Sequence, residues 1–165
     1  MTATNLKLPE IDVIDKDILE LLQNDAKITI KEISVKVGKS PTAIRSRIVR
    51  LEENLIKKYV ALIDCRQLGY REMVIASLRV NSSEPLERIK GHIEGMEKIK
   101  FAYIVTGEYP LFIMAKCMDH EDSMGLIEKL RNLPGVEEIK TQIVLDRIKE
   151  DHTIIIPEPI DKDKI

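Results

Sequence analysis

Apolar residues recur at helical spacing in the first third of the chain. A helix is predicted from Asp12 to Asn24, because aspartate is a favourable N-cap residue and four apolar residues after it fall on one side. These four are Ile14, Ile18, Leu21 and Leu22. A helix with one apolar side needs a partner to cover that side, so this helix is expected to be the first of three.

The stretch Ile30–Leu55 predicts two further helices joined by a tight turn. Thr29 and Glu32 have the spacing of a capping box at the start of the first of them. Gly38 follows its last turn, where a left-handed residue is common. Ser40 can then cap the second helix, whose first position is a proline.

The second of these helices has two chemically different sides. Its apolar side is spaced i, i+4, i+7 and i+11 and comprises Ile44, Ile48, Leu51 and Leu55. The other side carries Thr42, Ser46 and Val49, flanked by Arg45 and Arg50. Small polar, methyl and guanidinium groups can read base edges and hold phosphates. We interpret the pair as a helix-turn-helix; the alternative is an ordinary helical hairpin with a solvated basic side.

The side chains predicted to contact DNA lie at the start and along the outer side of this helix. They are Lys39, Ser40, Pro41, Thr42, Arg45, Ser46, Val49 and Arg50. Arg45 is the candidate for a bidentate guanine contact, whereas Lys39, Arg47 and Arg50 are candidate phosphate contacts. Arg47 lies nearer the apolar side, so a structural ion pair with an acid such as Glu20 is its alternative role.

Charge is distributed unevenly, although the formal net charge is only −2. Residues 27–58 hold nine Lys or Arg against three Glu, a balance of +6. Residues 10–25 hold six acids against one Lys, a balance of −5. A local basic patch in a nearly neutral chain indicates a local anionic partner.

Features of an enzyme, a metal protein or a membrane protein are lacking in the sequence. Cys65 and Cys117 stand far apart, and His92, His120 and His152 have no neighbours at metal-ligand spacing. We therefore predict no catalytic residues, no metal and no cofactor. No apolar run approaches the ~20 residues of a membrane helix, and no signal peptide is recognisable, which favours a cytoplasmic protein.

Strand and helix patterns alternate in the second half of the chain. The predicted elements are strands at 73–80, 100–105, 111–117 and 136–148 and helices at 82–97 and 119–133. Met124, Ile127, Leu130 and Leu133 are expected to face inward from the last helix. The order βαββαβ is the ferredoxin-like plan. Both helices would cover one face of an antiparallel sheet, so a second copy of the chain is expected to cover the other.

The predicted fold is α+β and has four parts. They are a winged helix-turn-helix domain at 1–55, a β linker or hinge at 56–71, a ferredoxin-like domain at 72–150 and a tail at 151–165. The linker assignment depends on the β-forming residues after position 55, which could be a wing or a linker strand. The polar, proline-broken tail is expected to be mobile, as is typical of chain ends.

This arrangement resembles the Lrp/AsnC (feast/famine) family of prokaryotic transcription regulators from about Ile11 to Glu150. The resemblance is carried by Asp12-x-x-Asp15-x-x-Ile18-Leu19, Val37-Gly38-Lys39-Ser40-Pro41-Thr42, Arg47-x-x-Arg50-Leu51-Glu52, Val105-Thr106-Gly107-Glu108-Tyr109 and Leu133-Pro134-Gly135-Val136. It implies a RAM-type second domain, paired helix-turn-helix units on double-stranded DNA, and homodimers that can assemble into tetramers or octamers. It also implies regulation by a small effector, usually an amino acid.

The resemblance further implies where an effector would bind. The corresponding residues are Thr106, Gly107, Glu108, Tyr109 and Thr141. The family turn commonly reads Gly-x-x-Asp, and here Pro110 occupies the position of the Asp. A carboxylate there could accept a hydrogen bond from a ligand ammonium group, whereas a proline side chain cannot.

Three other functions remain open at this stage. An architectural DNA-binding protein would show weak specificity and a steep salt dependence. A sensing module whose helix-turn-helix no longer binds DNA would fail to bind even at ~50 mM salt. Some tetrapyrrole decarboxylases resemble the same family in both domains, and a bound porphyrin would then absorb visible light.

Overall fold

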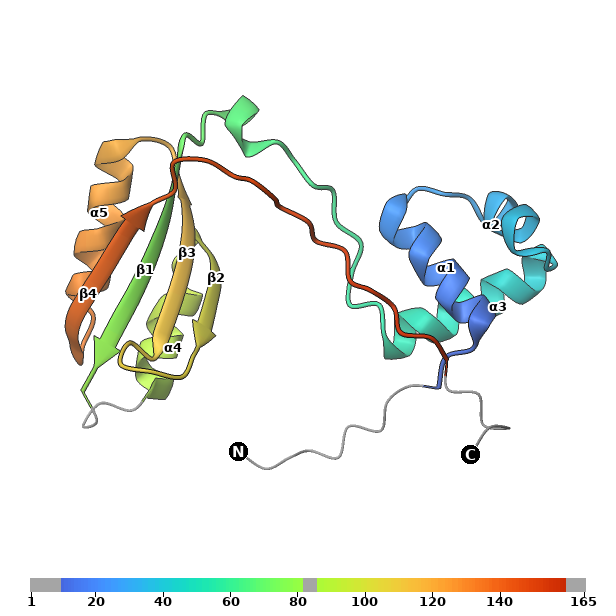
Figure 1. The fold of residues 1–165 in the computed structure, drawn as a ribbon, viewed down its shortest axis with the longest axis horizontal. Coiled ribbons are helices and arrows are strands. Elements are labelled where there is room, and N and C mark those ends of the chain that lie inside the picture. Colours follow the sequence, from blue (N-terminus) through green and yellow to red (C-terminus); the bar gives the residue numbers. More distant parts are fainter. Residues whose placement is uncertain (1–9, 82–85, 160–165) are drawn as a thin grey trace. The chain divides into compact units, whose positions relative to one another are not determined.

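The computed structural model describes residues 10–81 and 86–159, and Figure 1 shows their fold. Within these residues the chain forms two units. One unit contains residues 10–62 together with 151–159, and the other contains residues 63–150. The lead-in at 1–9, the end of the predicted tail at 160–165 and the first four positions of the helix predicted at 82–97 lie outside the described residues.

The described part of the first unit holds three helices that begin and end where local signals predict. They are α1 (Val13–Asn24), α2 (Ile30–Val37) and α3 (Pro41–Asn54). Asp12 and Thr29 each form a capping box, and the Ser40 hydroxyl accepts a hydrogen bond from the Ala43 N–H at 3.3 Å. Gly38 ends α2 with a φ of 69°, a left-handed conformation that glycine adopts without a steric penalty.

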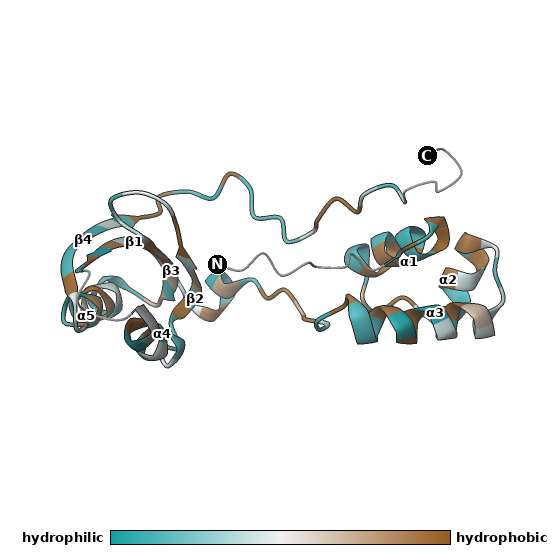
Figure 2. Cartoon of the chain, turned by 90° about the horizontal axis from the view of Figure 1, so that it is seen from below, coloured by the Kyte–Doolittle hydropathy of each residue, from teal (hydrophilic) through white to brown (hydrophobic). Residues whose placement is uncertain are grey.

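These three helices enclose a common apolar core. Its buried members from the helices are Ile18, Leu19, Ile33, Ile44 and Leu51. Each helix in Figure 2 carries both hydrophobic and hydrophilic residues, as an amphipathic helix requires. Leu55 was predicted to extend the buried stripe but is 40% exposed, because α3 ends at Asn54 and Leu55 leaves the helical path. Ile56 packs against the core in its place.

A further buried residue of this core comes from the other end of the chain. Ile156 is 8% exposed and packs with the helical core residues. The described part of the segment predicted as a separate, mobile tail therefore belongs to the helix-turn-helix unit. The sequence hides this because Ile156 follows two other isoleucines and precedes a proline, so neither a helical nor an alternating pattern marks it as the buried one.

No strand forms between residues 56 and 64, so the predicted wing or β linker is not present there. The residues in this segment favour β-structure, but a strand also needs a partner ladder, and no neighbouring strand of the described chain supplies one. A short 3₁₀-helix, η1 (Cys65–Leu68), follows this segment and is capped by the Asp64 side chain.

The second unit is a four-stranded antiparallel sheet with two helices in its described part. The elements are β1 (Glu72–Val80), α4 (Leu86–Glu94), β2 (Ile99–Ile104), β3 (Leu111–Cys117), α5 (His120–Arg131) and β4 (Val136–Ile143). The strand order β2-β3-β1-β4 is that of the predicted ferredoxin-like plan. β4 ends at Ile143, earlier than predicted, and Ile143 pairs with Val74 as the last residue of the β1–β4 ladder.

The core of this unit lies between the sheet and the helices. Its residues include Val74, Ala76 and Leu78 of β1, Ile113 and Ala115 of β3, and Ile89, Leu126 and Leu130 of the helices. Met124 was predicted to face inward, but it is 50% exposed. Ser123 is fully buried instead, so the inward stripe of α5 begins one residue earlier. A serine at the first stripe position concealed the correct phase from the hydrophobic pattern.

The opposite face of the sheet carries no helix in the described part of the unit (Figure 2). Strand alternation places Met73, Ile75, Phe101, Tyr103, Phe112 and Met114 on this face. The rings of Phe101 and Tyr103 stack with their centroids 6.2 Å apart, and both side chains are more than a third exposed. One chain therefore leaves an apolar surface with two exposed aromatic rings in contact with water.

Candidate nucleic-acid interface

Four exposed side chains follow one another along the outer side of α3. Thr42, Arg45, Ser46 and Val49 are spaced i, i+3, i+4 and i+7, which places them on one side of the helix. We call them the α3 stripe. Within the described chain, no hydrogen bond or ion pair involves the Arg45 side chain. Its guanidinium donors are therefore available for the O6 and N7 acceptors of a guanine.

The start of α3 is suited to an anion. Lys39, Ser40 and Pro41 are exposed there, and the first turn of α3 contains no acidic residue. The first turns of α1 and α2, by contrast, carry Asp15 and Glu32, which use the positive end of their own helices. The unpaired N–H groups of a helix start bind phosphate when no carboxylate competes for them.

Two other arginines of α3 are held by acids of α1. Arg47 Nη1 donates to Asp15 Oδ1 at 2.8 Å and to Asp12 Oδ2 at 2.7 Å. Arg50 Nη2 also pairs with the Asp15 carboxylate, whose side chain is only 1% exposed. Hydrogen bonding to Asp12, together with the pairing to Asp15, raises the pKa of Arg47. Partial burial alone would raise the pKa of Asp12, but the hydrogen bond from Arg47 and backbone bonding outweigh it and lower that pKa.

The ion-pair alternative for Arg47 is therefore the one that forms, although its partners are Asp12 and Asp15 and not Glu20. Arg50, predicted as a phosphate contact, has a structural partner in Asp15 while half of its side chain stays exposed. The phosphate contact of Arg50 stays a prediction. Sequence reasoning missed these pairs because the acids precede the arginines by more than 30 residues. The acidic segment 10–25 beside a basic one was the available signal.

The predicted effector turn contacts side chains of β1 and β4. Arg79 Nη1 donates to Glu108 Oε1 at 3.1 Å, and the Arg79 guanidinium carbon lies 5.9 Å from the centroid of the Tyr109 ring. Lys140 Nζ lies 4.0 Å from the same centroid, a cation–π geometry. Interaction with Tyr109 raises the pKa of Lys140. Glu108 and Tyr109 are thus fixed by charged residues that the sequence analysis did not identify.

Arg79 is a charged residue in an otherwise largely apolar strand, and this was the signal that could have marked it. It also pairs with Glu138 at 2.7 Å, directly across the β1–β4 ladder. Gly107 makes the turn possible, because its φ of 116° is one that other residues rarely adopt. Pro110 closes the turn through its backbone oxygen, which accepts from the Val105 N–H at 2.8 Å.

Thr141 is the predicted effector residue that the structure does not bring to this turn. It pairs with Ala76 in the β1–β4 ladder and shares the helix-covered face with it. Lys140, which contacts Tyr109, lies on the opposite face. Within one chain, Thr106, Gly107, Glu108 and Tyr109 therefore do not converge with Thr141, and the role of Thr141 stays a prediction.

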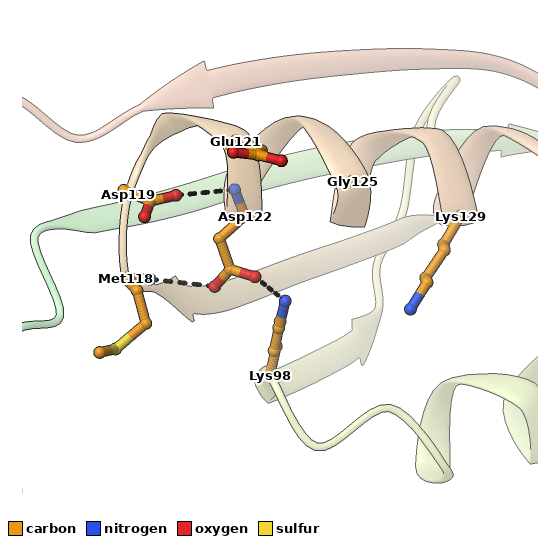
Figure 3. A pocket seen from close by; sticks show the side chains of 7 residues that line it. All are labelled: Lys98, Met118, Asp119, Glu121, Asp122, Gly125 and Lys129. Carbon is orange, nitrogen blue, oxygen red and sulfur yellow. Dashed lines mark hydrogen bonds and ion pairs between the residues drawn. The ribbon is translucent and has the colours of Figure 1, made fainter.

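A surface pocket of about 510 Å³ lies beside the N-terminal half of α5 (Figure 3). Two of its charged side chains bind each other: Asp122 pairs with Lys98 and also accepts from the Met118 N–H at 3.0 Å. None of the predicted effector residues lines it. The described residues contain no group of three or more His, Cys, Asp or Glu that could hold a metal ion. No helix in the described ranges is long and apolar enough to cross a membrane.

Comparison with known proteins also gives two domains, although the second match continues a few residues past the end of the second structural unit at residue 150. The AsnC-type helix-turn-helix domain matches residues 11–52, and the Lrp/AsnC ligand binding domain matches residues 73–154. The HTH-type transcriptional regulator FL11 of Pyrococcus horikoshii is 33% identical over 141 residues, which cover 85% of this chain and 93% of FL11. The leucine-responsive regulatory protein of Escherichia coli K12 is 30% identical over 151 residues, which cover 89% of this chain and 92% of that protein.

A solved structure supports the fold over the same length. The structure of Escherichia coli AsnC matches with a TM-score of 0.81 and 26% sequence identity, covering 87% of this chain and 97% of AsnC. The relatives of this chain are transcription regulators, so the decarboxylase alternative is set aside. The chain belongs to the Lrp/AsnC family, whose members are helix-turn-helix transcription regulators and not enzymes.

Proposed function

We propose that this protein is a sequence-specific, effector-modulated transcription regulator that reads double-stranded DNA with α3. The observation that supports this most strongly is the α3 stripe, an exposed row of side chains suited to base edges, on the side of α3 opposite the buried Ile44 and Leu51. Arg47 and Arg50 of α3 both have acidic partners, whereas Arg45 has none within the described chain. A helical hairpin without a ligand would have no use for such an exposed, unpaired arginine. A regulator of this kind acts on the genome, which in a prokaryote is cytoplasmic.

The residues of α3 divide into base contacts and backbone contacts. Arg45 is assigned to a guanine, and Thr42, Ser46 and Val49 to neighbouring base edges or thymine methyl groups in the major groove. Lys39, Ser40, Pro41 and the first N–H groups of the helix are assigned to phosphate. Arg50 adds a phosphate contact with the part of its side chain that is exposed.

The working form is proposed to be a homodimer formed through the helix-free face of the sheet, with tetramers or octamers as further assembly. An apolar surface containing two exposed aromatic rings is costly to leave in water, and a second copy provides an identical apolar surface to cover it. A two-fold dimer presents two α3 helices, so the DNA site should be a near-palindrome with half-sites spaced by whole turns, about 34 Å each.

The proposed effector is an amino acid. The second half of the chain matches a ligand-binding domain, and the Escherichia coli relative is named for its response to leucine. Thr106, Gly107, Glu108, Tyr109 and Thr141 are the candidate contacts. Tyr109 and Glu108 present an aromatic ring and a carboxylate beside Arg79 and Lys140, groups that can bind a zwitterion.

The experiment that tests this function uses the purified full-length chain and fragmented DNA from its own genome. Bound fragments are recovered and sequenced at several salt concentrations, with and without each amino acid. We expect enrichment of a near-palindromic motif that persists at physiological salt and shifts with one amino acid. Binding that is weak, uniform across sequences and lost steeply with salt would contradict sequence-specific regulation.

A further inference from the structure

The described end of the chain packs into the core of the helix-turn-helix unit. Ile156 is 8% exposed, while its neighbours Ile155 and Ile154 are 96% and 72% exposed. Ile156 belongs to the same buried cluster as Ile18 and Ile44. The segment 153–158, which we call the C-terminal strap, thus contributes one side chain to the core that supports α3.

Polar contacts hold the strap along α1 on both sides of this anchor. The Gln23 side chain donates to the Ile154 carbonyl at 3.0 Å and accepts from the Ile154 N–H at 2.8 Å. At the other end of α1, Lys16 pairs with Glu158. Lys16 and Gln23 are seven residues apart, about 10 Å along one side of a helix. Four extended residues from Ile154 to Glu158 span up to about 13 Å, which is enough to cover this distance. Because Ile154 meets the C-terminal end of α1 and Glu158 its N-terminal end, the strap runs antiparallel to α1.

α1 connects the strap to the DNA-reading helix. The side of α1 that carries Lys16 and Gln23 binds the strap, and its first turn binds α3 through the Asp15 pairs with Arg47 and Arg50. Displacement of the strap would therefore loosen the helix on which α3 is positioned. It would not remove any side chain of the α3 stripe.

We propose that the C-terminal strap is a working part of the DNA-binding unit, which positions α3 through α1 and so sets the affinity for DNA. This inference rests on the proposed function only for its DNA readout. The strap also gives the two units a second covalent connection. One connection leaves α3 after residue 55, and the other runs from the end of β4 at Ile143 to the strap.

The chain offers a matched pair of variants to test the strap. Ile156→Asp places a charge in the core, and Ile155→Asp places the same charge on the adjacent, fully exposed position. In the full-length protein we expect Ile156→Asp to weaken binding to a wild-type target duplex by about tenfold or more and to speed hydrogen exchange in α1. Exchange in β1 and the oligomer mass should be unchanged. Ile155→Asp and the conservative Ile156→Val should match wild type.

A second variant keeps the test decisive if Ile156→Asp does not fold. Gln23→Leu removes both hydrogen bonds to the Ile154 backbone, and Asn24→Ala is its control at the next position. We expect Gln23→Leu, and not Asn24→Ala, to speed hydrogen exchange of the Ile154 amide and to weaken DNA binding about two- to tenfold.

The proposal would be overturned if α1 exchange and DNA affinity were unchanged in both Ile156→Asp and Gln23→Leu. It would also be overturned if Ile155→Asp caused losses equal to those of Ile156→Asp. If wild type binds no DNA, the proposed function fails, while the exchange comparison still decides whether the strap supports α1.

Discussion

Arg47 Nη1 lies 2.8 Å from Asp15 Oδ1, and this bond joins α3 to α1 through a carboxylate that is 1% exposed. A buried carboxylate is tolerated only when it is paired and hydrogen-bonded, and Asp15 also accepts from the Asp12 N–H and pairs with Arg50. Two of the nine cations in the basic segment, Arg47 and Arg50, thus orient α3 against α1, and Arg50 still keeps half of its side chain exposed.

Substitution of Asp15 by Asn should destabilise the helix-turn-helix unit. The change keeps the shape of the side chain but removes the charge, leaving Arg47 and Arg50 without their shared partner. Breaking a buried pair costs about 3–5 kcal/mol, and the partial exposure of both arginines favours the lower end, about 3 kcal/mol. Urea unfolding followed by circular dichroism measures this. Asp17→Asn on the same helix is the control and should change stability little; equal effects of the two changes would contradict the role of Asp15.

Substitution of Met114 by Asp should dissociate the proposed dimer. Met114 lies on the helix-free face of the sheet, opposite Ile75, and a carboxylate there would be buried without a partner in the dimer. Met124→Asp is the matched control, because Met124 is 50% exposed on α5. Sedimentation velocity at low micromolar concentration should show a smaller species for Met114→Asp than for Met124→Asp. A Met114→Asp protein with the wild-type mass would place the dimer contact elsewhere.

The Tyr59 phenol should titrate unusually late. Partial burial, although Tyr59 stays 46% exposed, and the hydrogen bond that its phenol donates to Glu52 Oε1 at 3.0 Å raise the pKa of Tyr59 from 10.0 to about 12. A raised folded-state pKa means that the neutral phenol stabilises the fold below pH 10 and that this contribution is lost as the pH rises toward 12. Absorbance at 295 nm follows the titration, with Tyr59→Phe identifying the signal. Glu52→Gln should move the midpoint toward 10; an unmoved midpoint would show that Glu52 is not the partner.

Tyr109 should be required for the response to an amino-acid effector and not for DNA binding itself. Its ring lies 4.0 Å from the Lys140 amine, so Tyr109→Phe keeps the cation–π contact and Tyr109→Ala removes it. We expect Tyr109→Ala to bind target DNA as wild type does without effector, but to lose most of the effector-induced change in affinity. Tyr109→Phe should retain it. Fluorescence anisotropy across an effector titration measures both, and a wild-type response in Tyr109→Ala would exclude this turn as the effector site.

The parts of the fold that sequence predicted correctly depend on local signals. The capping residues Asp12, Thr29 and Ser40 and the left-handed Gly38 act on backbone groups within four residues, so they can be recognised in order along the chain. The α3 stripe follows from helical geometry alone once the helix is placed. The βαββαβ order of the elements likewise predicted the ferredoxin-like sheet and its open face.

The parts that sequence did not predict depend on contacts between distant residues. Ile156 reaches the first core from the far end of the chain, and Asp15 meets Arg47, which lies 32 positions later in the sequence. Neither leaves a periodic pattern. The predicted wing failed for a related reason, since β-propensity describes a residue's fit to a sheet and does not provide a neighbouring strand. Arg79 was missed because its partners come from a turn and from β4.

Arg45→Ala tests the central claim, that α3 reads base edges with its exposed stripe. Binding is measured against a library of duplexes randomised across the site, for wild type, Arg45→Ala and the control Lys31→Ala on the exposed surface of α2. We predict that Arg45→Ala loses its preference for one guanine in each half-site, worth about 1–3 kcal/mol, while preferences elsewhere persist. Lys31→Ala should keep the wild-type preferences. A uniform loss of affinity with every base preference intact would show that Arg45 contacts only the DNA backbone and would contradict the account.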